Sequence, residues 1–536
     1  MSKFINKSLY LDYLDCPKNA WLKTHSNNLK ALFKLSEYAK HLVKEGYFVE
    51  EHVQKLFPGG IKIEHGTNNA SAAQLTQELV LKKAPVLFQA TFIHDVFLAR
   101  NDILVYDAET NKRSLYEVKS IGLYPEHECE DSKACDKCKS NKKKAPKITQ
   151  IIEDVSFQAI ILQENGIEPD EIFLACLNKD YILGDQIDID KLIFFKDITN
   201  EVRGNKSKTE QRMQSAKQDL INSSEDQVCC PCIYKGRSSH CPTFKYSNPY
   251  ILDYSIHDIY YIGSSKKNLK YLVDNGCFKI DDIPESVKLS DNQNKQVQTY
   301  KNGQANIDFN KIKDELNSLK FPLYFFDYET YKPAIPIYKG FNPHIQMPFQ
   351  FSIHILHSPD KELDHFEYLH ESDSDPSLGI IQHLKQHIGP NGSIIVWHQS
   401  FEKDRNTELA ERHPEHKEFL ENINNRMYDL EVIFKLKKDA YIHPDFKGSS
   451  SIKNVLPVIC PELSYKDLAI QEGTAASLQW HKMIHGNLPE EQKQKIAKDL
   501  KRYCGLDTYA MYAIWKHLYI QCNFDQSKFA INEQVV

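Results

Sequence analysis

The sequence predicts an α/β protein with more than one domain. A chain of 536 residues is too long for one ordinary hydrophobic core. Short runs rich in β-branched and aromatic residues occur near residues 86–118 and again near 323–397, and helical patterns follow each run. We therefore expect an α/β domain over residues 1–250, a helical connector over 251–318 and a second α/β domain over 319–536.

The composition excludes a uniformly basic protein and predicts no membrane partner. The formal net charge is −6, and no apolar run approaches the roughly 20 residues of a membrane span. The first residues lack the apolar core of a secretory signal, so we expect a cytoplasmic location. Nucleic-acid binding would require local basic patches, for which the candidates are residues 133–147 and 203–217, with an ordinary solvated surface as the alternative.

Charged side chains gather on the predicted strands of the first domain. Asp102 opens one strand, and Glu117 and Lys119 lie on the next strand in an i, i+2 spacing that places them on the same face. Gln158 lies on the helix that follows. Because hard cations prefer carboxylate oxygens, Asp102 and Glu117 are candidate ligands for Mg²⁺ or Mn²⁺. A surface hairpin with alternating charges is the alternative.

The cysteines are spaced in a way that favours metal binding over disulfides. The chain has 13 of them, and disulfides are rare in a reducing cytoplasm. Cys16 lies in a helical pattern over residues 9–23, far upstream of Cys229, Cys232 and Cys241. The Cys-x2-Cys-x8-Cys spacing of the later three is typical of ligands to zinc or to an iron–sulfur cluster. Cys230 adjoins Cys229, so the sequence leaves the second ligand open.

A second candidate metal site lies in a polar, lysine-rich insertion at about residues 122–147. His127, Cys129, Cys135 and Cys138 form a four-ligand set there, for which Zn²⁺ is the expected ion. Reduced thiols on a solvated loop are the alternative.

A further acidic set belongs to the second domain. Asp327 and Glu329 end an apolar strand and project to one face, as two-metal hydrolysis requires of its carboxylates. Tyr503 and Asp507 are four residues apart on a predicted helix, and therefore share a face. Glu402 follows another strand and is the candidate fourth carboxylate, and Asp429 is the alternative.

The first set resembles the RecB-type branch of the PD-(D/E)xK nucleases. The order of strand, Asp102, hairpin, Glu117-Val-Lys119 and a helix with Gln158 matches the metal aspartate, glutamate, lysine and helix glutamine of that branch. The cysteine set is similar to that of its iron–sulfur members, which include CRISPR spacer-acquisition nucleases and AddAB-type nuclease subunits. The resemblance implies a restriction-endonuclease-like domain with a [4Fe–4S] cluster, held by Cys16, Cys229, Cys232 and Cys241.

The second set resembles the tyrosine subclass of DEDD-type 3′→5′ exonucleases, which have a DnaQ-like, RNase H-like fold. Asp327 and Glu329 match the first motif of that family, and Tyr503 with Asp507 matches the third. The second motif departs from the family because Glu402 stands where an aspartate is usual.

The whole chain also looks like predicted RecB-family nucleases that join the two kinds of domain through a helical linker. Together the resemblances imply a metal-dependent nuclease that hydrolyses DNA at two sites and has a helicase, repair or defence protein as a further partner. Two alternatives stay open. One is a nucleic-acid-binding scaffold with one or both sites inactive, and the other is an RNA-processing 3′→5′ exonuclease.

Overall fold

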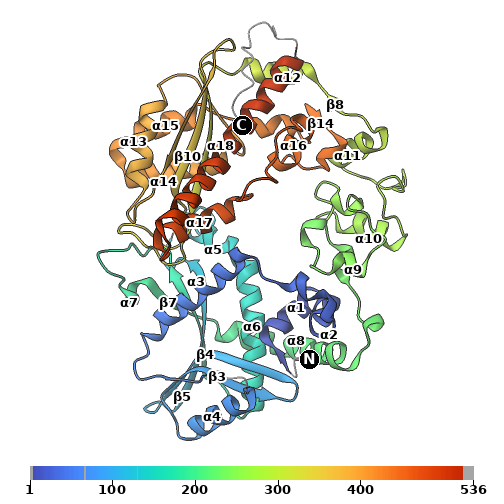
Figure 1. The fold of residues 1–536 in the computed structure, drawn as a ribbon. Helices are drawn as coiled ribbons and strands as arrows, with labels where there is room; N and C mark the ends of the chain where they lie inside the picture. Colours follow the sequence, from blue (N-terminus) through green and yellow to red (C-terminus); the bar gives the residue numbers. More distant parts are fainter. Residues whose placement is uncertain (1–3, 65–67, 130, 523–536) are drawn as a thin grey trace. The chain divides into compact units, whose positions relative to one another are not determined.

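The computed structural model describes residues 4–64, 68–129 and 131–522 (Figure 1). Residues 1–3 and 523–536, which the predicted domains included, lie outside this part of the chain. The chain divides into two compact units, and the prediction of a mixed α/β protein is confirmed. No helix in the described part is long and apolar enough to cross a membrane.

The division differs in detail from the predicted domains. The first unit comprises Met1–Ile233, Ser239–Pro249 and Pro333–Ile345, and the second comprises the rest of the chain. The stretch 251–318, expected to be a separate connector, groups with the second unit. Its helices are α10 (Lys266–Asp274), α11 (Asp291–Asn302) and α12 (Phe309–Asn317).

A seven-stranded sheet forms the centre of the first unit, in the order β2-β3-β4-β5-β6-β7 with β1 added to β4. Strands β3, β4 and β5 are antiparallel neighbours, whereas β6 runs parallel to β5 because a long helix, α6, makes the crossover. The strands are β1 (Ile5–Asn6), β2 (Ile61–Lys62), β3 (Val86–His94), β4 (Phe97–Asp107), β5 (Lys112–Leu123), β6 (Glu171–Asn178) and β7 (Ile193–Asp197).

Helix α6 (Ala145–Glu164) is the central helix of this unit. Nearly every residue from Ile151 to Leu162 is buried, and Phe157 stacks on Tyr10 of α1 with 4.7 Å between ring centroids. The other helices are α1 (Lys7–Asp15), α2 (Pro17–His25), α3 (Glu37–Gln54), α4 (Asn69–Leu81), α5 (Asp136–Lys143), α7 (Ile189–Leu192), α8 (Thr199–Lys217) and α9 (Phe244–Ser247).

The single helix expected over residues 9–23 is two helices. Cys16 has an extended backbone (φ −157°, ψ 108°) and separates α1 from α2, which has Pro17 in its first turn. Proline lacks a backbone N–H and clashes with the preceding turn, so it begins a helix more readily than it continues one. The break places Cys16 at a helix junction.

The second unit is built on a five-stranded sheet in the order β11-β10-β9-β12-β13. Strands β9, β10 and β11 are antiparallel, and β12 and β13 run parallel to β9. The strands are β9 (Leu323–Tyr331), β10 (Met347–Leu356), β11 (Leu363–Leu369), β12 (Ser393–Val396) and β13 (Met427–Asp429); a separate antiparallel pair is β8 (Asn306–Ile307) with β14 (Tyr441–Ile442).

Alternation along β9 divides its side chains between two faces. Tyr324, Phe326 and Tyr328 pack with α13 (Ser377–His387), α14 (Ser400–Arg412) and α15 (Lys417–Asn425) in one hydrophobic core. The opposite face is covered by α18 (Glu490–Gln521), where Phe325 contacts Trp515 at 6.0 Å between ring centroids. Asp327 and Glu329 belong to this second face. The remaining helices are α16 (Ile452–Ile459) and α17 (Gly473–His485).

Candidate functional site

Three carboxylates of the second unit converge between β9 and α18. Asp327, Glu329 and Asp507 each offer an oxygen, and these oxygens lie within 4.8 Å of one another. The strand supplies two of them by its i, i+2 alternation, and the long helix brings the third across the sheet. The structure thus joins the first and third groups of the predicted acidic set, which are about 180 residues apart in the chain.

Burial and mutual repulsion make these carboxyls hard to ionise. Burial raises the pKa of Asp327 well above its usual range, and the charges of Asp507 and Glu329 raise it further. The pKa of Glu329 is raised by the same two causes, burial and the charge of Asp507. Burial raises the pKa of Asp507 to about 6 although Tyr465 and Tyr503 donate hydrogen bonds to it. Like charges held this close need a compensating cation when all are ionised.

Glu402 lies outside the group of three converging carboxylates but close enough for its charge to act on Asp327. It lies in the first turn of α14, is 2% exposed, and its Oε2 atom has no hydrogen-bond partner among the described residues. Burial raises its pKa to about 8, and its charge in turn raises the pKa of Asp327. A buried carboxyl oxygen without a hydrogen-bond partner is costly, and such groups are more frequent at functional sites than elsewhere.

Asp429, the alternative fourth carboxylate, already has protein partners. Its Oδ1 accepts a hydrogen bond from the backbone N–H of His398 at 2.9 Å, and its Oδ2 accepts one from the ammonium of Lys435 at 2.9 Å. These contacts neutralise it and fix the start of α14. Of the two candidates, Glu402 is therefore the one suited to bind a cation.

Two further residues reach this site and were not predicted. The Tyr465 hydroxyl donates to Asp507 at 2.6 Å, and its ring lies 6.2 Å from that of Tyr503. Lys453 lowers the pKa of both Glu329 and Asp507 by its charge. Both come from loops and short helices between the predicted motifs, where no periodic signal links them to the acidic residues.

In the first unit, a buried ionic network surrounds Glu117. Its Oε1 accepts from Lys119 at 2.5 Å and from Lys7 at 2.9 Å, and its Oε2 accepts from Gln158 at 2.8 Å. Burial alone would raise the pKa of Glu117, but the two ammonium groups outweigh it and lower that pKa. Asp154 joins the network by accepting from Lys119 at 2.9 Å.

Asp102 lies on β4 beside this network. Its Oδ2 accepts from the backbone N–H of Val118 at 2.8 Å, which aligns it with the β5 residues around Glu117. Burial and the charge of Glu117 raise the pKa of Asp102 to about 7. The predicted residues Asp102, Glu117, Lys119 and Gln158 are thus neighbours.

The cation expected at Asp102 and Glu117 has a less complete ligand set than the one in the second unit. Among the described residues, no set of three His, Cys, Asp or Glu side chains that includes Asp102 and Glu117 offers atoms within 4.8 Å of one another. Lys7 and Lys119 supply positive charge beside Glu117 and Asp154 instead.

The sequence interpretation missed Lys7 and Asp154. Asp154 is four residues before Gln158 on α6, so its i, i+4 position was a usable signal. Lys7 had no such signal, because tertiary contacts bring it to the site: β1 pairs with β4 at Phe97, and Tyr10 of α1 packs on α6.

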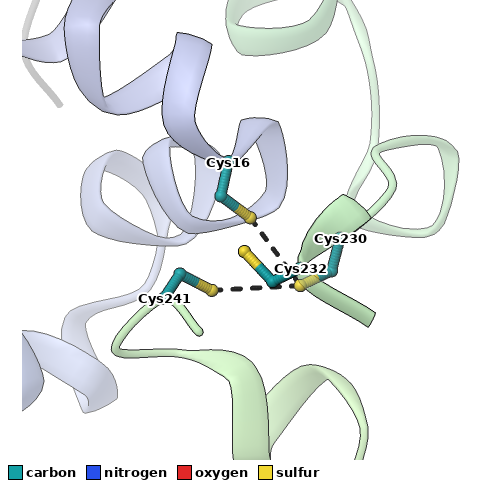
Figure 2. Close-up of side chains that lie close together, drawn as sticks. All are labelled: Cys16, Cys230, Cys232 and Cys241. Atoms are coloured by element: carbon teal, nitrogen blue, oxygen red, sulfur yellow. Dashed lines mark hydrogen bonds between the residues drawn. The ribbon is translucent and has the colours of Figure 1, made fainter. Parts of the chain in front are cut away.

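Four cysteines of the first unit form a compact group, which Figure 2 shows in close-up. The Sγ of Cys230 lies 3.7 Å from that of Cys16 and 3.9 Å from that of Cys241, and Cys232 completes the group. The helix junction presents Cys16, whereas the other three come from the segment after α8.

Cys230, not the predicted Cys229, is the member of this group. Cys229 is exposed, and its carbonyl accepts a hydrogen bond from the backbone N–H of Lys18. Neighbouring residues of an extended chain point to opposite sides, so only one of the two thiols can face Cys16. The ligand spacing is therefore Cys-x-Cys-x8-Cys.

The sulfur positions bear on the kind of metal that the group suits. Bonds of about 2.3 Å to one tetrahedral zinc ion place ligand sulfurs about 3.8 Å apart, close to the values found for Cys230. A four-iron cluster binds each cysteine through a different iron and so holds the sulfurs farther apart. The spacing favours a single ion over the expected cluster.

The lysine-rich insertion also brings its predicted ligands together. His127, Cys129, Cys135 and Cys138 each offer an atom within 4.8 Å of the others. Unlike the first cysteine group, this one is half-buried or exposed.

Comparison with known proteins identifies similarity but no activity. A family model described as "Domain of unknown function (DUF2779)" matches residues 324–451, which include Asp327, Glu329 and Glu402 but not Asp507. The uncharacterized protein MG366 of Mycoplasma genitalium is 30% identical over 225 residues, which cover 38% of this chain and 33% of that protein. Uncharacterized protein UU173 of Ureaplasma parvum is 28% identical over 249 residues, which cover 43% of this chain and 35% of that protein.

A homolog of MG366 in Mycoplasma pneumoniae is 28% identical over 220 residues, with 38% of this chain and 33% of that protein covered. The chain thus spans about a third of the length of the curated relatives that it matches. No solved structure matches the chain.

Proposed function

We propose that this protein is a metal-dependent nuclease that hydrolyses phosphodiester bonds of DNA, with one site in each unit. The observation that carries the proposal is the convergence of Asp327, Glu329 and Asp507, with the buried Glu402 near enough for its charge to act on Asp327. An acidic cluster of this kind is unfavourable by itself, and divalent cations remove the repulsion.

At the second site, the four carboxylates would hold Mg²⁺ or Mn²⁺. When bound, such ions polarise the scissile phosphate and stabilise the charge that develops on it. Tyr503 and Tyr465 hold Asp507 in place through their hydroxyl groups. Lys453 adds a positive charge that favours an approaching phosphate.

At the first site, Asp102 and Glu117 would hold one cation. Lys119 and Lys7 are both placed to contact the phosphate, because each ammonium lies near Glu117 and Asp154 and their side chains are 27% and 28% exposed. Gln158 positions Glu117 by donating to it, and is itself oriented by Asn101, which donates to its Oε1 at 2.9 Å. The sequence motif favours Lys119 of the two lysines.

The proposal is tested by digestion of end-labelled single- and double-stranded DNA and RNA with Mg²⁺ or Mn²⁺. We expect Asp327→Asn to abolish one pattern of digestion and Lys119→Ala to abolish another. The matched controls are Asp404→Asn, an exposed aspartate of α14, and Lys112→Ala, an exposed lysine of β5, and both should digest as the wild type does.

Three outcomes separate the alternatives. Digestion by both active-site variants at the wild-type rate would refute the assignment of the sites. An absence of digestion by every protein, the wild type included, would favour a binding scaffold. Digestion of RNA in strong preference to DNA would favour RNA processing.

For the cysteine group of Cys16, Cys230, Cys232 and Cys241, we propose a structural metal that joins the α1–α2 junction to the segment after α8. Zinc fits the sulfur spacing, and the resemblance to iron–sulfur nucleases makes a cluster the alternative. The visible spectrum of protein purified without oxygen distinguishes them, because a cluster absorbs near 400 nm on the order of 10⁴ M⁻¹ cm⁻¹ and zinc does not absorb there.

A further inference from the structure

We propose that His127, Cys129, Cys135 and Cys138 bind one Zn²⁺ ion, and that this ion fixes a lysine-rich helix that contacts nucleic-acid phosphates beside the first site. The zinc part stands independently of the nuclease proposal. The phosphate part rests on that proposed function and deepens it by assigning a substrate-binding element.

The distances between the ligand atoms match one tetrahedral ion. Zinc bonds of about 2.3 Å to sulfur and 2.0 Å to nitrogen place two sulfurs about 3.8 Å apart and a sulfur and a nitrogen about 3.5 Å apart. The Sγ atoms of Cys129 and Cys138 are 3.6 Å apart, and Nε2 of His127 lies 3.6 Å from Cys138 and 3.1 Å from Cys135.

The imidazole of His127 is oriented as a zinc ligand requires. Its Nδ1 lies 3.1 Å from the carbonyl oxygen of Pro125, to which it donates a hydrogen bond in the tautomer that leaves Nε2 unprotonated. Metal-binding histidines usually donate their second nitrogen to a carbonyl or carboxylate in this way. The free Nε2 is the atom that faces Cys135 and Cys138.

The helix of the insertion buries no side chain that would stabilise it. Helix α5 (Asp136–Lys143) has eight residues, and none of them is buried. Asn141 pairs with the backbone of Tyr124, and Ser140 accepts from Lys179 at 3.2 Å. Isolated helices this short are marginal in water, and small segments without a core are commonly ordered by a metal. Cys135 precedes the first turn of this helix and Cys138 lies in it, so a metal bound by both would fix the start of the helix.

The later part of the insertion is basic in a chain whose net charge is −6. Residues 131–147 contain seven lysines against two aspartates, a net charge of +5, and three glutamates before them reduce the net charge of the whole insertion, residues 122–147, to +2. Lys142, Lys143, Lys144 and Lys147 are exposed and form no ion pair with any residue that the structure describes. Unpaired lysines on one short segment are suited to phosphate binding.

The position of the insertion links it to the first site. It leaves β5 four residues after Lys119, and it returns through α6, the helix of Asp154 and Gln158. From Lys144 to Asp154 the helix rises about 15 Å at 1.5 Å per residue. At about 3.4 Å per nucleotide, this separation corresponds to four or five nucleotides of a bound strand.

The zinc site is tested by metal analysis of the full-length protein. We expect the double variant Cys135→Ser with Cys138→Ser to contain one equivalent of zinc less than the wild type. Cys277→Ser, a half-buried cysteine outside both groups, is the matched control and should keep the wild-type zinc content. Circular dichroism and thermal unfolding check that each protein is folded. An unchanged zinc content in the double variant would overturn the site.

The phosphate contact is tested by the anisotropy of a labelled single-stranded oligonucleotide, without added Mg²⁺ so that cleavage does not interfere. Each lost contact to a single strand reduces the salt slope of the affinity by about 0.7. For Lys143→Ala with Lys144→Ala we therefore expect a slope lower by about 1.4 and binding about 25-fold weaker at 0.1 M salt, with the zinc content unchanged. The matched control replaces the exposed pair Lys266 and Lys267 at the start of α10.

Affinity and salt slope that equal those of the control pair would overturn the phosphate role. Weaker binding by both the cysteine and the lysine variants, with zinc lost only from the former, would support both parts. Neither measurement requires digestion, so failure of the nuclease proposal would be recognised separately in the digestion assay.

Discussion

Replacing Glu402 by glutamine should stabilise the second unit and inactivate its site. The Glu402 carboxyl is 2% exposed, and its pKa is raised from 4.5 to about 8, first by burial and then by the charge of Asp429. The folded protein thus holds this proton more tightly than the unfolded chain does. The contribution of Glu402 to the free energy of unfolding is therefore fully present below pH 4.5 and is lost as the pH rises through 8.

The magnitude follows from the size of that shift. At pH 7, which is 2.5 units above the usual pKa of 4.5, this effect lowers the free energy of unfolding by about 3 kcal/mol, at about 1.4 kcal/mol per pKa unit. Glutamine has nearly the same shape and no proton to lose. The stability advantage of Glu402→Gln should therefore grow by about 2 kcal/mol between pH 6 and pH 8, because the buried carboxyl is itself about half ionised at pH 8.

The assay is thermal unfolding in a metal chelator at pH 6, 7 and 8. For a unit of this size, about 3 kcal/mol corresponds to an increase in Tm of about 6–12 °C. Glu411→Gln, an exposed position at the other end of α14, is the control and should leave Tm unchanged. If the difference between Glu402→Gln and the wild type is the same at pH 6 and pH 8, the reasoning is refuted.

Two more predictions concern the metals. Because the pKa values of Glu402 and Asp507 are raised to about 8 and about 6, a cation that binds there has to displace protons. Calorimetry in buffers of different ionisation enthalpy should show more protons released on Mg²⁺ binding at pH 7 than at pH 9; equal release would contradict this. Cys16→Ser should lose one metal equivalent and lower the Tm of the first unit by several degrees, whereas Cys522→Ser, which changes a buried cysteine of the second unit that belongs to neither group, should retain the metal.

The acidic motifs were predictable because they follow local rules. Asp327 and Glu329 share a face through strand alternation, and Tyr503 and Asp507 share one through helical spacing. The order of Asp102, Glu117 and Gln158 along the chain was equally visible.

Other features of the sites depend on contacts that the sequence does not encode locally. The choice between Cys229 and Cys230 depends on which thiol the backbone turns toward Cys16. Lys7 reaches Glu117 because a two-residue strand extends the sheet and α1 packs on α6. The preference for Glu402 over Asp429 likewise depends on tertiary structure, because hydrogen bonds from His398 and Lys435 already occupy the Asp429 carboxylate.

The sequence alone determined that the protein is of the α/β class, which acidic residues pair within each element, and that its cysteines and histidine occur in two ligand-like groups. These properties follow from periodicity and spacing over short stretches of chain. Tertiary structure decided which groups meet, which carboxyls find partners and which stay buried without one. These depend on burial and on charge–charge distances, which only the packing of distant segments sets.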